Sequence, residues 1–449
     1  MELGAALPAW STLPFLGILL SIALFPLVAP HTWHRHYPKV ALAWGLLLAV
    51  PFVGVYGYTA VHEILHALIA DYLPFIILLA ALFTIGGGIY LRGALRGTPW
   101  VNAGILLAGT LLASWVGTTG AAMVLIRPLL RANAHRKYRA HTVVFFIFLV
   151  ANIGGALTPL GDPPLFLGFL RGVPFFWTLH LVPETLLVAA LVLAVYVVWD
   201  HRLWKKETPE VRQHPVKHTG QERLRLEGAH NFLFLAGVLA AVIVSGVWHP
   251  GEVRLLGIPQ GIQSLAREAF LLAMLAASWL TTSRALRKKN GFSWGPIREV
   301  AILFAAIFIT IIPALAILKA GEHGALSWLI RGVKTPAEFF WATGILSSFL
   351  DNAPTYLTFL SSALGRLYPE VAERQAVLHL IAEHGAFLKA IATGAVFMGA
   401  NTYIGNAPNL MVKSIAEEAG VEMPSYLGYM KYSLLVLVPV FLLVTWLFF

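Results

Sequence analysis

The chain contains no cysteine, which excludes disulfide bonds, zinc sites built on thiolates and iron–sulfur clusters. Charged residues are also scarce. Asp, Glu, Lys and Arg make up 12% of the 449 residues, about half the usual share of a soluble domain. The sequence has no Walker-type phosphate-binding motif, so it offers no site for direct coupling to ATP. The scarcity of charge argues against a soluble protein.

Hydrophobic residues dominate instead, at 58% of the chain with a mean hydropathy of +0.74. Apolar runs long enough to cross a bilayer recur along the whole sequence, so we predict an all-α polytopic membrane protein. Residues 13–30 follow a start without a basic segment and are expected to be a retained helix, not a cleaved signal peptide. The net charge of +10 is best explained by basic cytoplasmic loops.

The longest polar interruption, residues 200–229, divides the chain nearly in half and is expected to be a basic cytoplasmic linker. The other basic loops to be placed on the same side are 31–39, 92–99, 131–141 and 283–291. With these loops inside, residues 101–131 must enter the membrane and return as a re-entrant hairpin. The same count makes residues 338–364 a hairpin that enters from the opposite side.

We therefore expect residues 1–199 and 230–449 to be two repeats of inverted topology, with about ten full crossings in total. Each repeat also carries a broken helix, at 141–175 and 377–418. Within the breaks, GALTPLGDPP (155–164) and GANTYIGNAP (399–408) are identical at five of ten positions. Inverted repeats with broken helices are typical of secondary transporters.

Glycine and proline disfavour a continuous helix at both breaks, and the residues concerned are Gly155, Gly161, Pro163, Pro164, Gly405 and Pro408. Backbone groups freed inside a membrane are tolerated only where protein buries them or water reaches them. Such groups are also useful, because helix N-termini attract anions and unwound carbonyls coordinate cations.

Polar residues at the two hairpin tips and the two breaks are expected to converge at mid-membrane depth. They are Thr118, Thr119, Asn152, Thr158, Asp162, Asp351, Asn352, Thr355, Asn401, Thr402, Asn406 and Asn409. A charge at a helix centre costs about 2.5–3.5 kcal/mol, so Asp162 and Asp351 are expected to meet a cation, a proton or several donors. Each Asp could instead cap the following helix, and the Asn and Thr residues could simply join neighbouring helices.

Burial in the membrane favours the neutral form of an acid. A proton and Na⁺ would then compete for the same carboxylate, which gives antiport without a separate gate. The expected Na⁺ ligands are Asp351, Asn352 and Asp162, and the expected cargo is Na⁺ and H⁺, with no cofactor.

The segments ANIGGALTPLGDPP, DNAPTYLTFL and NTYIGNAPNLM resemble the ion transporter superfamily. That superfamily includes arsenite pumps, dicarboxylate and citrate carriers, and sodium/proton antiporters of the D type. The chain is similar to bacterial members named sodium/proton antiporter or citrate transporter. By position, Asp351-Asn352 matches the acidic hairpin tip of the antiporters, and Gly161–Pro164 matches the broken helix of the first repeat.

This resemblance implies an inverted-repeat fold with a central site at the hairpin tips. It also implies a scaffold part, a moving transport part and a homodimer, without enzymatic activity, in the bacterial inner membrane. Dicarboxylate carriers carry Ser-Asn-Thr at both tips, whereas here the tips are Gly117-Thr118-Thr119 and Asp351-Asn352-Ala353. An Na⁺/H⁺ antiporter is therefore the first hypothesis, and a Na⁺- or H⁺-coupled carrier of citrate, dicarboxylate or another small anion is the second.

A third hypothesis is a membrane zinc protease built on HEILH, residues 62–66, where His62 and His66 lie one helical turn apart and Glu63 could act as a base. Such a site needs a third ligand, and Asp162 is the only candidate, in a sequence that does not match. A hydrated segment at the membrane–water interface explains HEILH better. The cluster His31, His34 and His36 could anchor the chain to lipid headgroups or sense pH.

We predict that Asp351→Asn abolishes coupled Na⁺/H⁺ exchange while the protein still folds, because the amide cannot exchange a proton for Na⁺. The measurement is Na⁺-driven proton movement in proteoliposomes, with size-exclusion chromatography to verify folding. Undiminished proton movement in this variant would refute the competition hypothesis.

Overall fold

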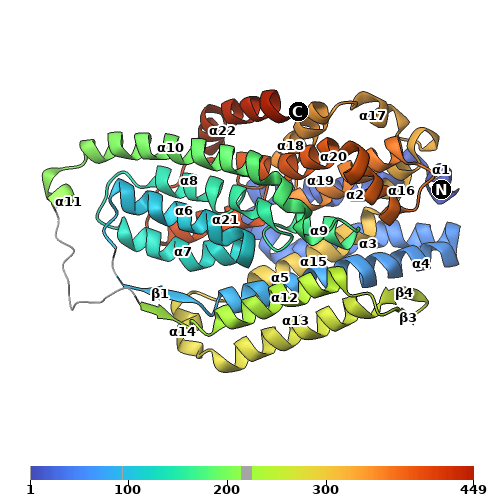
Figure 1. The fold of residues 1–449 in the computed structure, drawn as a ribbon, viewed down its shortest axis with the longest axis horizontal. Helices are drawn as coiled ribbons and strands as arrows, with labels where there is room; N and C mark the ends of the chain where they lie inside the picture. The colour runs from blue at the N-terminus through green and yellow to red at the C-terminus, as the bar shows by residue number, and fades with distance from the viewer. Residues whose placement is uncertain (1, 94, 214–224) are drawn as a thin grey trace.

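The computed structural model describes residues 2–93, 95–213 and 225–449 (Figure 1). It is mostly helical. The first half contains α1 (Glu2–Ala6), α2 (Leu13–Val28), α3 (Pro30–Tyr56), α4 (Tyr58–His66), α5 (Leu73–Gly86), β1 (Tyr90–Arg92), α6 (Pro99–Val116), α7 (Thr118–Ala132), α8 (Ala140–Leu149), α9 (Pro163–Leu170), α10 (Val182–Lys206) and α11 (Pro209–Gln213). A π-helix, Ala67–Tyr72, joins α4 to α5, and 3-10 turns occur at Ala9–Thr12, Ile153–Leu157 and Phe175–Leu181.

The second half contains β2 (Arg225–Glu227), α12 (Asn231–Val247), β3 (Glu252–Leu255), β4 (Ile258–Gly261), α13 (Ile262–Thr281), α14 (Arg284–Lys289), α15 (Gly295–Thr310), α16 (Ile312–Lys319), α17 (Ser327–Gly332), α18 (Pro336–Phe349), α19 (Asn352–Leu367), α20 (Glu373–Met398), α21 (Ala407–Glu418) and α22 (Tyr426–Phe448). Two further 3-10 turns are Gly321–His323 and Gly399–Asn401. The strands form two small antiparallel pairs, β1 with β2 and β3 with β4, which lie toward opposite ends of the molecule (Figure 1).

Eight helical segments of the described residues are long and apolar enough to cross a membrane, or nine if the bent pair α15 and α16 forms one span. The outer helices also expose large apolar side chains. On α22, for example, Leu434, Leu435 and Trp446 are 57%, 70% and 80% exposed. Apolar patches of this kind are stable when lipid covers them. The chain is therefore an integral membrane protein.

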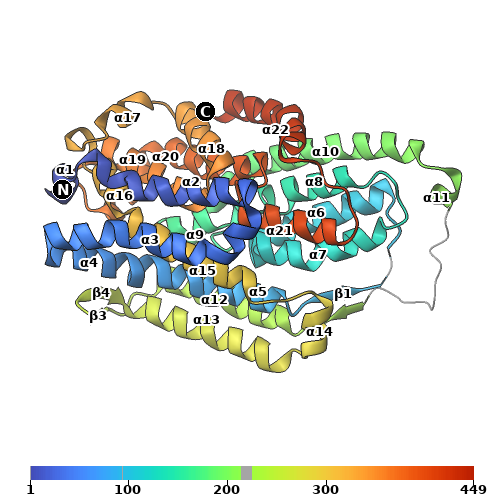
Figure 2. The same ribbon diagram turned by 180° about the vertical axis from the view of Figure 1, so that it is seen from behind.

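The long helices pack as two groups. The first bundle consists of α2–α5, α12, α13, α15 and α16, and its helices, apart from α16, pack chiefly on one another. The second bundle consists of α6–α10 and α18–α22. Contacts between the bundles run mainly through α16 against α19, and through α5 against α7 and α9. In both views α12 and α13 lie along one edge of the molecule, and α10 and α22 lie along the other (Figures 1 and 2).

Helices stop at both predicted hairpin tips. α6 ends at Val116 and α7 starts at Thr118, and the intervening Gly117 has a φ of +80°, which favours glycine. α18 ends at Phe349, and α19 starts at Asn352. The helices also stop at both predicted breaks. Extended backbone at Asp162 and at Asn406 turns the chain into α9 and α21, which each carry proline in the first turn.

The structure differs from the sequence-based expectation in the first basic loop. Residues 31–39 form the first turns of α3, not a loop. Trp33 explains the difference, because its indole is 3% exposed, stacks on Phe25 of α2 and donates a 3.3 Å hydrogen bond to Glu299. His31 and His34 lie on exposed parts of this helix.

The boundary of the expected linker also differs. α10 continues through residue 200 to Lys206, and residues 214–224 of the linker lie outside the described residues. Asp200 is fully buried and bonds the Arg136 guanidinium, His141 Nε2 at 2.8 Å and the Tyr196 hydroxyl at 3.0 Å. Asp200 therefore joins α10 to the chain that leaves α7, a long-range partnership that local sequence does not reveal.

We predict that Asp200→Asn strongly destabilises the protein, because breaking a buried ion pair on one side costs about 3–5 kcal/mol. Arg136 would be left in the interior with only the Glu207 carboxylate, 4.0 Å from its Nε, as a partner of opposite charge. The measurement is the apparent unfolding temperature in detergent. Glu417→Gln is the control, since Glu417 forms an exposed i,i+4 pair with Lys413 that should contribute under about 0.5 kcal/mol. Equal unfolding temperatures of the two variants would contradict the prediction.

Candidate functional site

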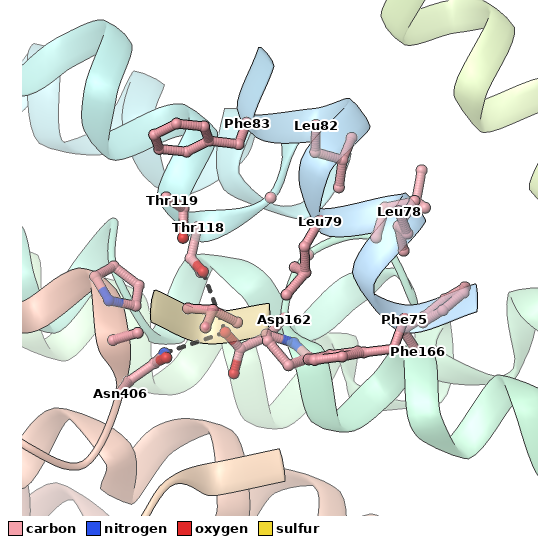
Figure 3. A pocket seen from close by; sticks show the side chains of 18 of the residues that line it. Phe75, Leu78, Leu79, Leu82, Phe83, Thr118, Thr119, Asp162, Phe166 and Asn406 are labelled. Atoms are coloured by element: carbon pink, nitrogen blue, oxygen red, sulfur yellow. Dashed lines mark hydrogen bonds between the residues drawn. The ribbon is translucent and has the colours of Figure 1, made fainter. Parts of the chain in front are cut away.

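A cavity of about 100 Å³ lies between the two bundles, beside the first hairpin tip and both helix breaks (Figure 3). Its two walls differ in chemistry. The first bundle contributes only apolar residues, namely Phe75, Leu78, Leu79, Leu82, Phe83, Pro296, Ile297, Val300 and Phe304. The polar lining side chains all belong to the second bundle and are Thr118, Thr119, Asp162, Asp351 and Asn406.

Asp162 lies at the centre of the polar wall and is 1% exposed. Thr118 and Asn406 each donate a hydrogen bond of 3.1 Å to its Oδ1, and Asn352 donates one of 2.5 Å to its Oδ2. The first two bonds are drawn in Figure 3. These donors come from the starts of α7 and α19 and from the turn before α21. One carboxylate therefore joins both hairpin tips and both breaks. All three donors are neutral, so they solvate its charge without cancelling it.

Asp351 lines the same cavity and is half-buried. Its carboxylate accepts a 3.1 Å hydrogen bond from the Ala353 backbone N–H, so it caps α19. The capping alternative therefore applies to Asp351. It does not apply to Asp162, whose side chain makes no such bond to the described residues of α9.

Asn352 presents an unusual acceptor. Its Nδ2 donates to Asp162, but its buried Oδ1 has no hydrogen-bond partner among the described residues. Buried acceptors are nearly always satisfied, so an unpaired one calls for an explanation. An oxygen beside two carboxylates is a suitable ligand for a cation or a water molecule.

Three asparagines connect the two breaks. Asn406 donates to Asn152 Oδ1 at 3.2 Å, and Asn152 donates to Asn409 Oδ1 at 2.8 Å. Asn409 then donates to the carbonyls of Gly399 and Thr402, both at 2.9 Å. All three side chains are at most 2% exposed. Asn152 and Asn409 are not among the lining residues of the cavity, and they hold Asp162 in place through Asn406, which is one of them.

The other predicted residues lie further from Asp162. The Thr158 hydroxyl donates to the Ser114 carbonyl, and the Thr402 hydroxyl donates to the Ser348 carbonyl. Asn401 donates to Ser348 Oγ at 2.9 Å. Thr355 donates to the Asp351 carbonyl at 2.9 Å, within its own helix. Thr119 lines the cavity, whereas Thr158, Asn401 and Thr402 fasten hairpins and breaks together.

Ser114 and Ser348 are absent from the predicted site, yet both fasten a hairpin to a break. Ser114 Oγ donates to the Gly154 carbonyl at 2.5 Å, and Ser348 Oγ donates to the Met398 carbonyl at 3.1 Å. Each serine stands three residues before its hairpin tip, at Gly117 or Asp351. That shared spacing is the sequence signal that could have identified them.

In each break, a pair of glycines lets two backbone segments approach closely. A Cβ at Gly161 would lie 2.1 Å from the Gly155 carbonyl oxygen, and one at Gly405 would lie 2.6 Å from that of Gly399. Only glycine permits these backbones to approach so closely. The same pair of positions therefore closes the unwound loop in each half of the chain.

The HEILH residues lie elsewhere, on α4 and at a second cavity of about 530 Å³ that Glu63 and His66 line. Across residues 2–93, 95–213 and 225–449 there is no group of three or more His, Cys, Asp or Glu side chains able to hold a metal ion. The described structure therefore offers no zinc centre for the protease hypothesis.

Comparison with known proteins identifies the family. Residues 4–449 match the model of the family described as "Putative citrate transport". The chain belongs to this family. It is also 27% identical over 341 residues to uncharacterized transporters of Mycobacterium bovis and of Mycobacterium tuberculosis, covering 72% of this chain and 71% of each relative. The family and these relatives are transporters by name, and none is named as an enzyme.

We predict that Ser114→Ala and Ser348→Ala each lower stability, because each leaves buried backbone groups at a break without a partner. An unsatisfied buried group costs about 1–3 kcal/mol. The measurement is again the apparent unfolding temperature. Ser21→Ala is the control. The Ser21 hydroxyl donates to the Gly17 carbonyl within the same helix, at 2.7 Å, and accepts from Trp44, so it bonds neither a hairpin nor a break. A larger loss in the control would contradict the role given to the two serines.

Proposed function

We propose that this family member is a secondary active transporter that exchanges Na⁺ for H⁺ across the bacterial inner membrane. The observation that carries the proposal is the environment of Asp162. It is buried, all three of its side-chain donors are neutral, and it shares a cavity with a second carboxylate, Asp351. Two such acids repel an anion and attract a cation or protons.

The proposed Na⁺ site uses oxygen ligands that already converge there. Asp162 and Asp351 line the cavity with their carboxylates, and Asn352, which donates to Asp162 through Nδ2, offers an Oδ1 that is unpaired among the described residues. Protonation of a carboxylate removes the charge that holds Na⁺, so the two ions compete for one site. Each ion then crosses only when the other has left, and competition alone couples the two fluxes.

The proposed architecture is that of two inverted repeats, residues 1–199 and 230–449, joined by the linker and giving about ten crossings. The recurring bonds support it, because Ser114 with Thr158 and Ser348 with Thr402 fasten the hairpin to the break in the same way. On this proposal α6 with α7 and α18 with α19 are re-entrant hairpins from opposite sides. The second bundle moves against the first by an elevator-like or rocking motion, in a homodimer surrounded by lipid.

A second candidate is a Na⁺- or H⁺-coupled carrier of citrate or another small carboxylate. The family description favours it. The structure adds one favourable feature, because α9 and α21 both begin at the cavity, with Pro163 and Ala407 in its wall. Helix N-termini attract anions. An anion could bind only after protons or cations had neutralised Asp162 and Asp351.

A flux assay in proteoliposomes tests the proposal. We expect Na⁺ to alkalinise acid-loaded vesicles without any organic acid, and we expect Asp162→Asn to abolish this flux. The amide keeps the shape of the side chain but removes the exchangeable charge. Glu417→Gln, on an exposed helix face, should transport normally and is the control.

Two outcomes would contradict parts of this proposal. The first is a proton flux that requires citrate or another carboxylate, which would support the second candidate. The second is full Na⁺-driven flux in the Asp162→Asn variant, which would remove Asp162 from the ion site.

A further inference from the structure

One short helix joins the two cavities. α9 begins at the first cavity, where Asp162, Pro163 and Phe166 form part of the wall. It ends at Arg171, which lines the second cavity. With eight residues the helix is only about 12 Å long. Asp162 and Arg171 directly flank this one helix, so a displacement of α9 as a unit would displace both.

Arg171 holds the two bundles together at that second cavity. Its Nη2 lies 2.7 Å from Asp71 Oδ2, and its Nη1 lies 2.8 Å from Glu373 Oε1. Lys319 Nζ lies 3.8 Å from Glu373 Oε2. Asp71 and Lys319 belong to the first bundle, whereas Arg171 and Glu373 belong to the second. The four side chains therefore form an ion-pair latch across the boundary.

The latch and the Asp162 cavity face opposite ends of the molecule. Phe83, near the end of α5, and Pro296, near the start of α15, line the Asp162 cavity. These helix ends point toward β1 and α14 (Figure 1). The latch cavity is lined by Leu3 and Gly4 of α1. In Figure 1, α1 lies at the right-hand end, whereas β1 and α14 lie toward the left.

The remaining charged groups around the latch make Arg171 critical. Glu63 and His66 of α4 and Glu370 before α20 also line the cavity. Acids therefore outnumber Arg171 and Lys319. Without Arg171, Asp71 and Glu373 would face each other across the bundle boundary with too little positive charge between them. Removal of one partner from a buried pair leaves an uncompensated charge, which strongly favours separation or hydration.

We propose that Arg171 is a positioning residue of the transport cycle, and that its ion pairs keep the α1 face closed while the Asp162 cavity opens toward the opposite face. α9 links the two events, because a change of occupant at Asp162 shifts the helix that carries Arg171. The proposal rests on the transport function proposed above. It concerns which face is open and does not depend on which ion is carried.

The absence of native cysteine allows a direct test by thiol labelling. Ser361→Cys reports on the latch cavity and Val300→Cys reports on the Asp162 cavity, since these residues line the two spaces. A membrane-impermeant maleimide is applied from each side to oriented vesicles that contain the full-length variant. We expect R171Q to raise the labelling rate of S361C severalfold and to lower that of V300C, because the α1 face then opens.

Two further variants make the test decisive. R366Q is the matched control, because Arg366 is also half-buried but bonds only the carbonyls of Ile330 and Val333, and it should leave both labelling rates unchanged. If R171Q does not fold, the quadruple variant D71N/R171Q/K319Q/E373Q removes all four charges of the latch without changing the net charge, and it should show the same shift. Unchanged labelling of both reporters in the folded variant would overturn the latch.

Coupling through α9 is tested by a double-mutant cycle. D162N should change the labelling rate of S361C when Arg171 is present and have no further effect in R171Q. Equal effects of D162N in both backgrounds would overturn the coupling. Labelling requires no flux, so a shift in labelling without Na⁺/H⁺ exchange would reject the proposed cargo and keep the latch. Na⁺/H⁺ exchange without a shift in the labelling rates would keep the proposed cargo and reject the latch.

Discussion

The carboxylate of Asp162 is the interaction on which the centre of this molecule depends. Its two oxygens receive donors from α7, α19 and the turn before α21, and these donors lie up to 244 residues from Asp162 in sequence. Removing this group would leave Thr118, Asn352 and Asn406 without a shared acceptor, in an interior where unpaired polar groups are costly. The same group holds the hairpin tips and breaks together and supplies negative charge to the cavity.

The breaks show how irregular backbone is tolerated inside a membrane protein. Each break pairs two glycines at close range, Gly155 with Gly161 and Gly399 with Gly405, and each is fastened to a hairpin through a serine and a threonine. The freed backbone groups thus find partners within the protein, as the hydrocarbon interior of a bilayer requires. The two halves differ at one position of this arrangement. Asp162 in the first half corresponds to Asn406 in the second, so only one of the two carries a charge.

The sequence was sufficient to predict the membrane class and the positions where helices stop, at Gly117, before Asn352 and at both breaks. Glycine, proline and Asp or Asn interrupt hydrophobic runs there, and local backbone chemistry determines the outcome. It was not sufficient to predict which polar residues meet. Thr158 and Thr402 look equivalent to Thr118, yet they bond hairpin carbonyls instead of Asp162. That difference depends on the relative placement of distant helices, which no local pattern encodes.

Long-range ion pairs were missed for the same reason. Asp200 looked like the first residue of a polar linker, because its neighbours are charged and its partner Arg136 lies 64 residues away in sequence. Nothing in the local sequence indicates the ion pairs of Arg171, because its partners Asp71 and Glu373 lie 100 and 202 residues away. A charged residue in a hydrophobic protein can be recognised from sequence, whereas its partner cannot.

The two walls of the Asp162 cavity divide the work of transport between the bundles. Every polar side chain in the lining comes from the second bundle, and the first bundle offers only Phe, Leu, Pro, Ile and Val. In the transport cycle proposed here, an ion bound by Asp162 and Asp351 would keep its side-chain ligands when the second bundle moves, because all of them belong to that bundle. The apolar wall makes no directional bonds that would have to break, so it can serve as the surface along which the site travels. Among the contacts described for the two cavities, the ion pairs Arg171–Asp71 and Lys319–Glu373 cross this boundary. In the proposed cycle they place the resistance to motion at the face where the latch lies.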